Sequence, residues 1–157
     1  MQKARVAAVD ASRCTGCELC RLVCSFKKEG KFDPGRSRIA VAQDDGGGFA
    51  PRVCHNCGEP PCVDACPAGA IRKRKEDGRV VLLNDKCQGC NMCVMVCPFN
   101  AIAWRGGSCH ACDGCEGAEG CAEICPPGAV RFVALNAESR RKRKDLAARL
   151  TGLSRGP

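Results

Sequence analysis

The chain has 157 residues, a formal net charge of +8 and 17 cysteines, but only 5 Phe, 1 Trp and no Tyr. This length fits one compact unit or two very small ones, and so few aromatic residues exclude an ordinary aromatic core. No segment is apolar for long enough to span a membrane, and residues 1–10 contain neither the apolar stretch of a signal peptide nor a twin-arginine pair, which predicts a cytoplasmic protein.

Sixteen of the cysteines fall into four successive runs of four. The third run, at residues 87–98, reads C-x2-C-x2-C-x3-C-P, which is typical of a loop that binds a [4Fe–4S] cluster and gives its last cysteine to a neighbouring cluster. The second and fourth runs have a longer middle gap, and the first is followed by Ser25 in place of proline. In chain order the runs are Cys14, Cys17, Cys20 and Cys24; Cys54, Cys57, Cys62 and Cys66; Cys87, Cys90, Cys93 and Cys97; and Cys109, Cys112, Cys121 and Cys125.

This spacing suits an iron–sulfur cube. Iron in sulfide clusters takes soft thiolate ligands, and two C-x2-C steps turn the backbone so that three cysteines reach one face of the cube. Four runs predict four [4Fe–4S] clusters that serve as the core, with folding coupled to metal binding. Zinc sites commonly use two separated C-x2-C pairs, and a disulfide-rich secreted protein would need a signal peptide, so both alternatives are disfavoured.

Short strands and turns connect the runs. Strands are expected at residues 6–9, 37–41, 70–75, 79–83, 101–104 and 129–133, with an Asp-Gly hairpin turn at 76–78 and a flexible glycine-rich segment at 44–48. These elements predict an α+β fold of two pseudo-symmetric bacterial-ferredoxin-like modules, one inserted in the other.

The modules divide the chain into four parts. Residues 1–30 and 107–133 form the outer two-cluster module, residues 31–49 a connector, and residues 50–106 the inner two-cluster module. Residues 134–157 form a basic tail, in which leucines recur at helical spacing after a run of Arg and Lys. No aromatic residues interleave with that run, so a docking tail for an acidic partner is expected rather than a nucleic-acid contact.

The four runs, with Cys-Pro closing the last three, resemble the four-cluster electron-transfer subunits of molybdenum and tungsten oxidoreductases. The resemblance covers residues 5–133, and that family includes subunits of formate dehydrogenase, dimethyl sulfoxide reductase, nitrate reductase, hydrogenases and carbon monoxide dehydrogenases. Three segments, at residues 24–26, 34–39 and 54–62, are similar to the small iron–sulfur subunit that accompanies tungsten aldehyde oxidoreductases.

The resemblance implies that the fourth cysteine of each run binds the cluster of the paired run. The clusters would then lie in a row, close enough for electron tunnelling. The implied ligand sets are Cys54, Cys57, Cys62 with Cys97; Cys87, Cys90, Cys93 with Cys66; Cys14, Cys17, Cys20 with Cys125; and Cys109, Cys112, Cys121 with Cys24.

The third ligand of the last run stays open between Cys115 and Cys121, because Cys109, Cys112 and Cys115 also have C-x2-C-x2-C spacing. Three residues separate the third and fourth cysteines in every other run, which favours Cys121 and leaves Cys115 as a spare thiol.

Three other residues near the runs are expected to have supporting roles. His55 and His110 each follow a run cysteine, and we expect them to hydrogen-bond to sulfur or backbone rather than replace a thiolate. Trp104 is expected to pack over the inner module.

Four bound clusters would also offset the formal net positive charge of the chain. A [4Fe–4S] core of charge 2+ with four thiolates carries −2, so four clusters contribute roughly −8 and offset the +8 of the chain. Every cube has four cysteines, which leaves no open iron for a substrate, and neither a phosphate-binding glycine loop nor a nucleophile elbow occurs.

The chain is therefore predicted to be a non-catalytic electron-transfer subunit. It would connect a tungsten- or molybdenum-pterin catalytic subunit, as in an aldehyde oxidoreductase, to a flavin- or NAD-binding subunit or another acceptor. Self-association into a longer electron wire is compatible with a row of clusters. The alternatives are a free polyferredoxin, or the corresponding subunit of a hydrogenase, a formate dehydrogenase or a carbon monoxide dehydrogenase.

Overall fold

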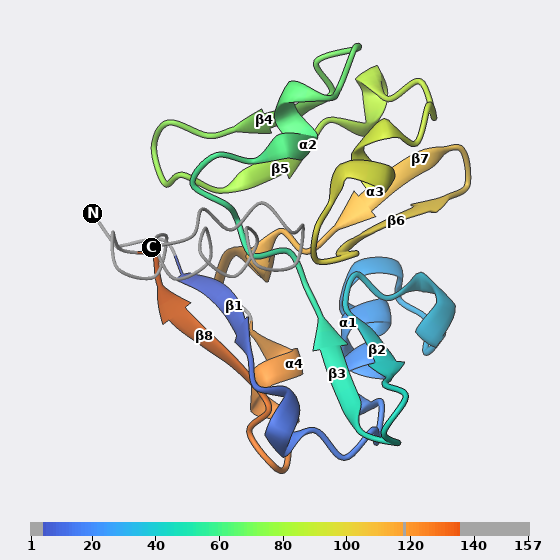
Figure 1. The fold of residues 1–157 in the computed structure, drawn as a ribbon, viewed down its shortest axis with the longest axis vertical. Helices are drawn as coiled ribbons and strands as arrows, with labels where there is room; N and C mark the ends of the chain where they lie inside the picture. Colours follow the sequence, from blue (N-terminus) through green and yellow to red (C-terminus); the bar gives the residue numbers. More distant parts are fainter. Residues whose placement is uncertain (1–4, 118, 136–157) are drawn as a thin grey trace.

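A computed structural model describes residues 5–117 and 119–135. In this part of the chain, four two-stranded antiparallel sheets and four short helices are arranged in two lobes (Figure 1). The lower lobe in Figure 1 contains residues 5–53 and 112–135, and the upper lobe contains residues 54–111. The described residues therefore form a small mixed structure with no large sheet.

The lower lobe is closed by its first and last strands, β1 and β8. They pair antiparallel, with Arg5 opposite Ala134 and Val9 opposite Val130. A second hairpin and two helices complete this lobe. Its elements are β1 (Arg5–Val9), α1 (Leu19–Glu29), β2 (Ala40–Gln43), β3 (Phe49–Arg52), α4 (Gly120–Glu123) and β8 (Val130–Ala134).

The upper lobe consists of two hairpins, each of which follows a short helix. Strands β4 and β5 pair with each other, as do β6 and β7. Helices α2 and α3 each contain the third cysteine of a run and end before the fourth. The elements are α2 (Pro61–Asp64), β4 (Ile71–Lys73), β5 (Val80–Leu82), α3 (Met92–Val96), β6 (Ile102–Arg105) and β7 (Ser108–Ala111).

Cysteines make up a large part of both apolar cores. The lower core contains Val53, Val130 and Phe132 together with three buried cysteines, and the upper core contains three buried cysteines among aliphatic side chains. Trp104 is about half exposed, but its indole nitrogen lies beside Gly89 in the upper lobe. This composition agrees with the expectation that aromatic residues do not form the core.

Two arginines of the upper lobe bind backbone carbonyls of the lower lobe. The Arg79 guanidinium donates to the Asp113 carbonyl at 3.2 Å, and Arg105 donates to the Ser37 carbonyl at 2.7 Å. Because each arginine carries several donors in a fixed plane, these contacts restrict rotation of one lobe against the other.

The hairpin around residues 76–78 is confirmed, as are the strands expected near residues 6–9, 101–104 and 129–133. The strand expected at 37–41 begins later, at Ala40. Strands β3 and β7 were not expected. Strand β7 follows a Gly106-Gly107 turn in which both residues have positive φ, a geometry that favours a two-residue hairpin.

The expected module boundary between residues 106 and 107 falls inside this β6–β7 turn. The expected tail helix lies outside the described residues. Within the described ranges, no helix has the length and apolar character that crossing a membrane requires.

Candidate iron–sulfur sites

The four cysteine runs share one backbone feature. In each of the first three runs the residue directly before the second cysteine has a positive φ, and in the last run the residue before Cys115 does; this geometry favours glycine or asparagine. Alternation of right- and left-handed residues turns successive amides into a concave nest that binds anions, including iron–sulfur clusters. The four residues are Gly16 (φ 71°), Asn56 (φ 50°), Gly89 (φ 68°) and Gly114 (φ 76°).

One group of cysteines lines a cavity in the upper lobe. Cys87, Cys90 and Cys93 of the third run share this cavity with Cys66 of the second run and with Cys109. The Ala70 amide donates to the Cys66 sulfur at 3.3 Å, which fixes the exit of that run. The structure therefore brings together the four residues that the family pattern pairs here.

A second cavity, in the lower lobe, collects the equivalent group. It is lined by Cys14, Cys17 and Cys20 of the first run and by Cys125 of the last. Burial raises the pKa of Cys20 to about 11, and the nearby Cys125 contributes to this rise. Pairing of β1 with β8 explains this proximity, because those strands bring the two ends of the described chain together.

The remaining cysteines of the second run face Cys97. Burial raises the pKa of Cys62 to about 12, and the next contributions come from Cys97 and Cys57. The Ala101 amide donates to the Cys97 sulfur at 3.4 Å, in the same way as Ala70 to Cys66.

The last run is arranged differently from the sequence prediction. Burial raises the pKa of Cys121 to about 12, followed by the effects of Cys112, Cys24 and Cys115. Cys115 and Cys121, between which the sequence left the third ligand open, therefore both lie near Cys112 and Cys24.

Cys109 instead lies in the upper lobe, with its sulfur 3.3 Å from that of Cys93. It is only 2% exposed and belongs to the upper core. The physical reason is the pairing of β7 with β6, which turns the Cys109 side chain away from Cys112. The sequence held a signal for this difference: Gly114 precedes Cys115, whereas Ala111, a strand residue, precedes Cys112.

The four groups follow one another in space, as cross-group effects on the cysteine pKa values indicate. Cys93 of the third run is near Cys62 of the second, and Cys54 is near Cys112. Cys20 of the first run is in turn near Cys121. Each link joins one group to the next, so the groups form one succession of neighbours, which we call the line.

The two ends of this line reach the surface. Of the seventeen cysteines, Cys17 and Cys90 are exposed, whereas the others are buried or intermediate. Cys90 lies in the group at one end and Cys17 in the group at the other. An electron could therefore enter and leave at opposite ends.

The donor sets fit iron–sulfur clusters. Four soft sulfur donors per group are the ligands that such clusters take, and iron binding displaces the protons that burial keeps on these thiols. Within the described ranges, no three His, Cys, Asp or Glu side chains meet the geometry for one metal ion. A cube does not require that geometry, because each thiolate binds a different iron.

The two histidines make contacts of different kinds. The His110 ring nitrogen lies 3.3 Å from the Arg105 carbonyl and 3.1 Å from the Ser108 hydroxyl, so the expected backbone contact is confirmed. The His55 ring packs on Phe99 with centroids 4.1 Å apart.

Comparisons with known proteins support the same assignment. The 4Fe-4S dicluster domain family matches residues 47–135, and a 4Fe-4S binding domain matches residues 11–27. The B subunit of the anaerobic dimethyl sulfoxide reductase of Escherichia coli K12 is 38% identical over 161 residues, which cover 89% of this chain and 78% of that protein.

Two further similarities extend the comparison. The polyferredoxin-like subunit of the aliphatic sulfonate oxidoreductase of Pyrococcus furiosus is 39% identical over 119 residues, covering 74% of this chain and 69% of that one. A subunit of the BamBC active site complex of benzoyl coenzyme A reductase, as isolated, has a TM-score of 0.50 at 22% identity. That match covers 96% of this chain and 89% of the other, and it shows similarity of fold.

Proposed function

Because the chain belongs to the 4Fe-4S dicluster family of iron–sulfur electron-transfer subunits of oxidoreductase complexes, we propose that it carries four [4Fe–4S] clusters between a catalytic subunit and an electron acceptor. The observation that carries this proposal is the linear succession of four groups of four cysteines, with an exposed cysteine at each end. The chain itself has no catalytic role in this proposal.

The proposed ligand sets follow the groups described above. Three agree with the family pattern, and the fourth takes Cys115 in place of Cys109. The sets are Cys66, Cys87, Cys90 and Cys93; Cys54, Cys57, Cys62 and Cys97; Cys24, Cys112, Cys115 and Cys121; and Cys14, Cys17, Cys20 and Cys125.

The protein contributes position and environment to electron transfer. Bound [4Fe–4S] clusters supply one-electron chemistry, while the chain fixes their order and spacing. Backbone hydrogen bonds from Asn56, Gly89 and Gly114 favour the thiolate forms of Cys54, Cys87 and Cys112. The Ala70 and Ala101 amides donate to Cys66 and Cys97. Such hydrogen bonds stabilise the added negative charge of the reduced state.

The partner is proposed to be a tungsten- or molybdenum-pterin subunit, with an aldehyde oxidoreductase favoured by the segments at residues 24–26, 34–39 and 54–62. A flavin- or NAD-binding subunit or another acceptor would take the electrons at the far end. The names of the relatives support membership in a multi-subunit oxidoreductase. Reduced thiols suit the cytoplasm, which is the compartment we propose.

Anaerobic purification of the tagged protein from its own cells tests both parts of the proposal. We expect about sixteen irons and sixteen sulfides per chain, and visible absorbance that dithionite bleaches. About eight irons, or stoichiometric zinc, would contradict the four clusters.

Co-purification of a pterin-containing subunit, identified by mass spectrometry, is expected in the same preparation. A hydrogenase or carbon monoxide dehydrogenase in its place would select that alternative. Recovery of the protein by itself, fully loaded with iron and at native expression level, would favour a free polyferredoxin.

A further inference from the structure

We propose that Lys28 and Arg38, both held by Asp113, raise the reduction potential of the cluster bound by Cys24, Cys112, Cys115 and Cys121. This inference rests on the ligand sets proposed above, and it concerns residues that bind no iron themselves. Lys28 and Arg38 would act on the cluster through their positive charges and would not bind iron.

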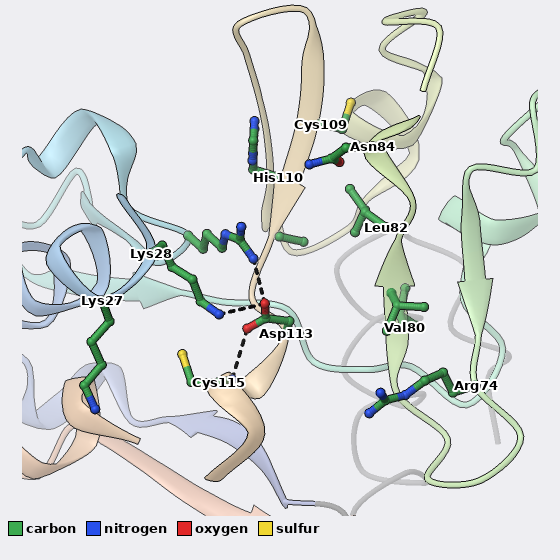
Figure 2. A pocket seen from close by; sticks show the side chains of 13 residues that line it. Lys27, Lys28, Arg74, Val80, Leu82, Asn84, Cys109, His110, Asp113 and Cys115 are labelled. Atoms are coloured by element: carbon green, nitrogen blue, oxygen red, sulfur yellow. Dashed lines mark hydrogen bonds and ion pairs between the residues drawn. The ribbon is translucent and has the colours of Figure 1, made fainter. Parts of the chain in front are cut away.

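Asp113 is the centre of this arrangement. One carboxylate oxygen accepts from Lys28 Nζ at 2.8 Å and from Arg38 Nη1 at 2.7 Å. The other oxygen accepts the Cys115 amide at 3.0 Å. Figure 2 shows Lys28 reaching Asp113 beside Cys115. A single carboxylate thus holds two cations next to a proposed ligand.

Both residues also lie beside the sulfur group. The Arg38 backbone amide donates to the Cys24 sulfur at 3.3 Å. The Cys115 amide donates to the same Asp113 carboxylate that holds the Lys28 ammonium, which places Lys28 near Cys115. Lys28 and Arg38 therefore act on two different members of the same ligand set.

The charges around Asp113 do not cancel. Two cations face one carboxylate, which leaves one positive charge beside the sulfurs. The side chains of Lys28 and Arg38 are only 18% and 22% exposed, so water screens them less than it screens surface charges. The potential of an iron–sulfur cluster depends on nearby charge, hydrogen bonds to sulfur and solvent exposure. Positive charge favours the reduced state because that state is the more negative one.

A cavity of about 500 Å³ adjoins this arrangement. Lys27 and Arg74 line it together with Lys28 and Arg38 (Figure 2). Lys27 itself lies against this ligand group, because its ammonium approaches Gly120, the residue before Cys121. Lys31, an exposed lysine shortly after the end of α1, is therefore the control. Its removal controls for a general loss of positive charge.

The test is a redox titration of the four-cluster protein, followed by electron paramagnetic resonance. Lys28→Met keeps the aliphatic stem and removes the charge. By Coulomb's law at an effective dielectric of about 20, a unit charge roughly 10 Å from a cluster changes the reduction equilibrium about tenfold. We therefore expect one of the four clusters to become about tenfold harder to reduce, a shift of about 59 mV for one electron.

Two further variants decide the cause. Lys28→Arg retains the charge and should titrate like the wild type, and Lys31→Met should shift the same cluster much less than Lys28→Met does. Equal titration curves for Lys28→Met and wild type would overturn the inference. It would also be overturned if Lys28→Arg lowered the reduction potential of the cluster as much as Lys28→Met does.

Iron content separates this inference from the proposed function. If the wild-type protein holds about sixteen irons and its reduction potentials are unchanged in Lys28→Met, the inference is contradicted and the proposed function is not. If Lys28→Met failed to retain iron, Lys28→Gln would be titrated in its place, because its amide can still donate to Asp113. The same shift is expected, and an unchanged reduction potential would contradict the inference.

Discussion

The sulfur atoms of Cys109 and Cys93 lie 3.3 Å apart in the upper lobe, so Cys109 is next to a sulfur group to which the spacing of the runs did not assign it. Cys115 occupies the position near Cys24 and Cys121 that Cys109 was expected to fill. In the proposed ligand sets, Cys115 therefore takes the role that the sequence analysis gave to Cys109.

This exchange predicts opposite effects of two serine substitutions. Cys115→Ser should remove or convert one cluster and lower the iron content from about sixteen to about twelve per chain. Cys109→Ser should keep all four clusters, because its sulfur is a neighbour of ligands and not a ligand. Iron analysis and electron paramagnetic resonance check both results. Loss of a cluster in Cys109→Ser with retention in Cys115→Ser would restore the original assignment.

A glycine with positive φ in a cysteine loop should tolerate substitution by alanine less well than such a glycine elsewhere. Gly16 has φ +71°, and an added Cβ would lie 2.7 Å from ring atoms of Phe49, whereas Gly30 has φ +68° with nothing within 4 Å. Gly30→Ala should lower the free energy of unfolding by about 1–2 kcal/mol, because alanine is strained in the left-handed backbone conformation. Gly16→Ala should lower the free energy of unfolding by about 1–3 kcal/mol more, because its methyl group would overpack against Phe49.

The denaturant midpoint for loss of visible absorbance, measured anaerobically, compares the two glycine variants. Equal midpoints would mean that Phe49 moves aside without cost. Phe49→Ala in the Gly16→Ala background should recover part of the difference, since the crowded ring is then gone.

The β4–β5 turn should contribute stability that acid removes. Burial alone would raise the pKa of Asp77, but hydrogen bonds from Arg74 and the Arg79 amide, and both guanidinium charges, outweigh it and lower that pKa. The folded pKa is thus below the unfolded value of about 3.9. The resulting stability is present above the unfolded value and is lost as pH falls through the folded one.

Asp77→Asn should therefore destabilise the protein by about 1–2 kcal/mol at pH 7, and the difference from wild type should shrink below about pH 4. Anaerobic unfolding of the two proteins across this pH range checks the trend, since acid damage common to both cancels in the difference. Asp45→Asn, at an exposed position in another loop, is the control. A difference that stays constant with pH would contradict the ionic origin.

The tail at residues 136–157 should matter for assembly and not for iron. It carries the run of basic residues and the three spaced leucines, a pattern that suits a partner groove with an acidic rim. A protein truncated after residue 135 should keep its clusters and its reduction by dithionite, but bind the catalytic subunit more weakly in a pull-down. A truncated protein that loses iron and still assembles would assign the tail to the fold.

Sequence spacing predicts local features of this protein well. The hairpin at Asp77-Gly78 depends on a few neighbouring residues, and it occurs where it was expected. Pairing across the chain is harder to predict, because spacing alone does not say which of Cys109, Cys112 and Cys115 begin a cluster loop.

The β6–β7 hairpin decides that question, and its Gly106-Gly107 turn was a readable signal. Once Ser108–Ala111 is a strand, Cys109 must lie with the upper core, and the next C-x2-C loop begins at Cys112. Strand pairing therefore overrides the match of cysteine spacing. The contacts of Lys28 and Arg38 with Asp113 could not be predicted at all, because they join residues that are far apart in sequence.

The pairing of β1 with β8 has a consequence for biosynthesis. β1 emerges from the ribosome before the other described strands, but its partner is the last of them. Residues 54–111 are complete earlier, and at roughly 5–20 residues per second the ribosome needs about 1–5 s more to reach β8. During that interval the thiols of the first run have no Cys125 beside them, so cluster insertion can begin in the upper lobe while the lower lobe still waits for its final strand.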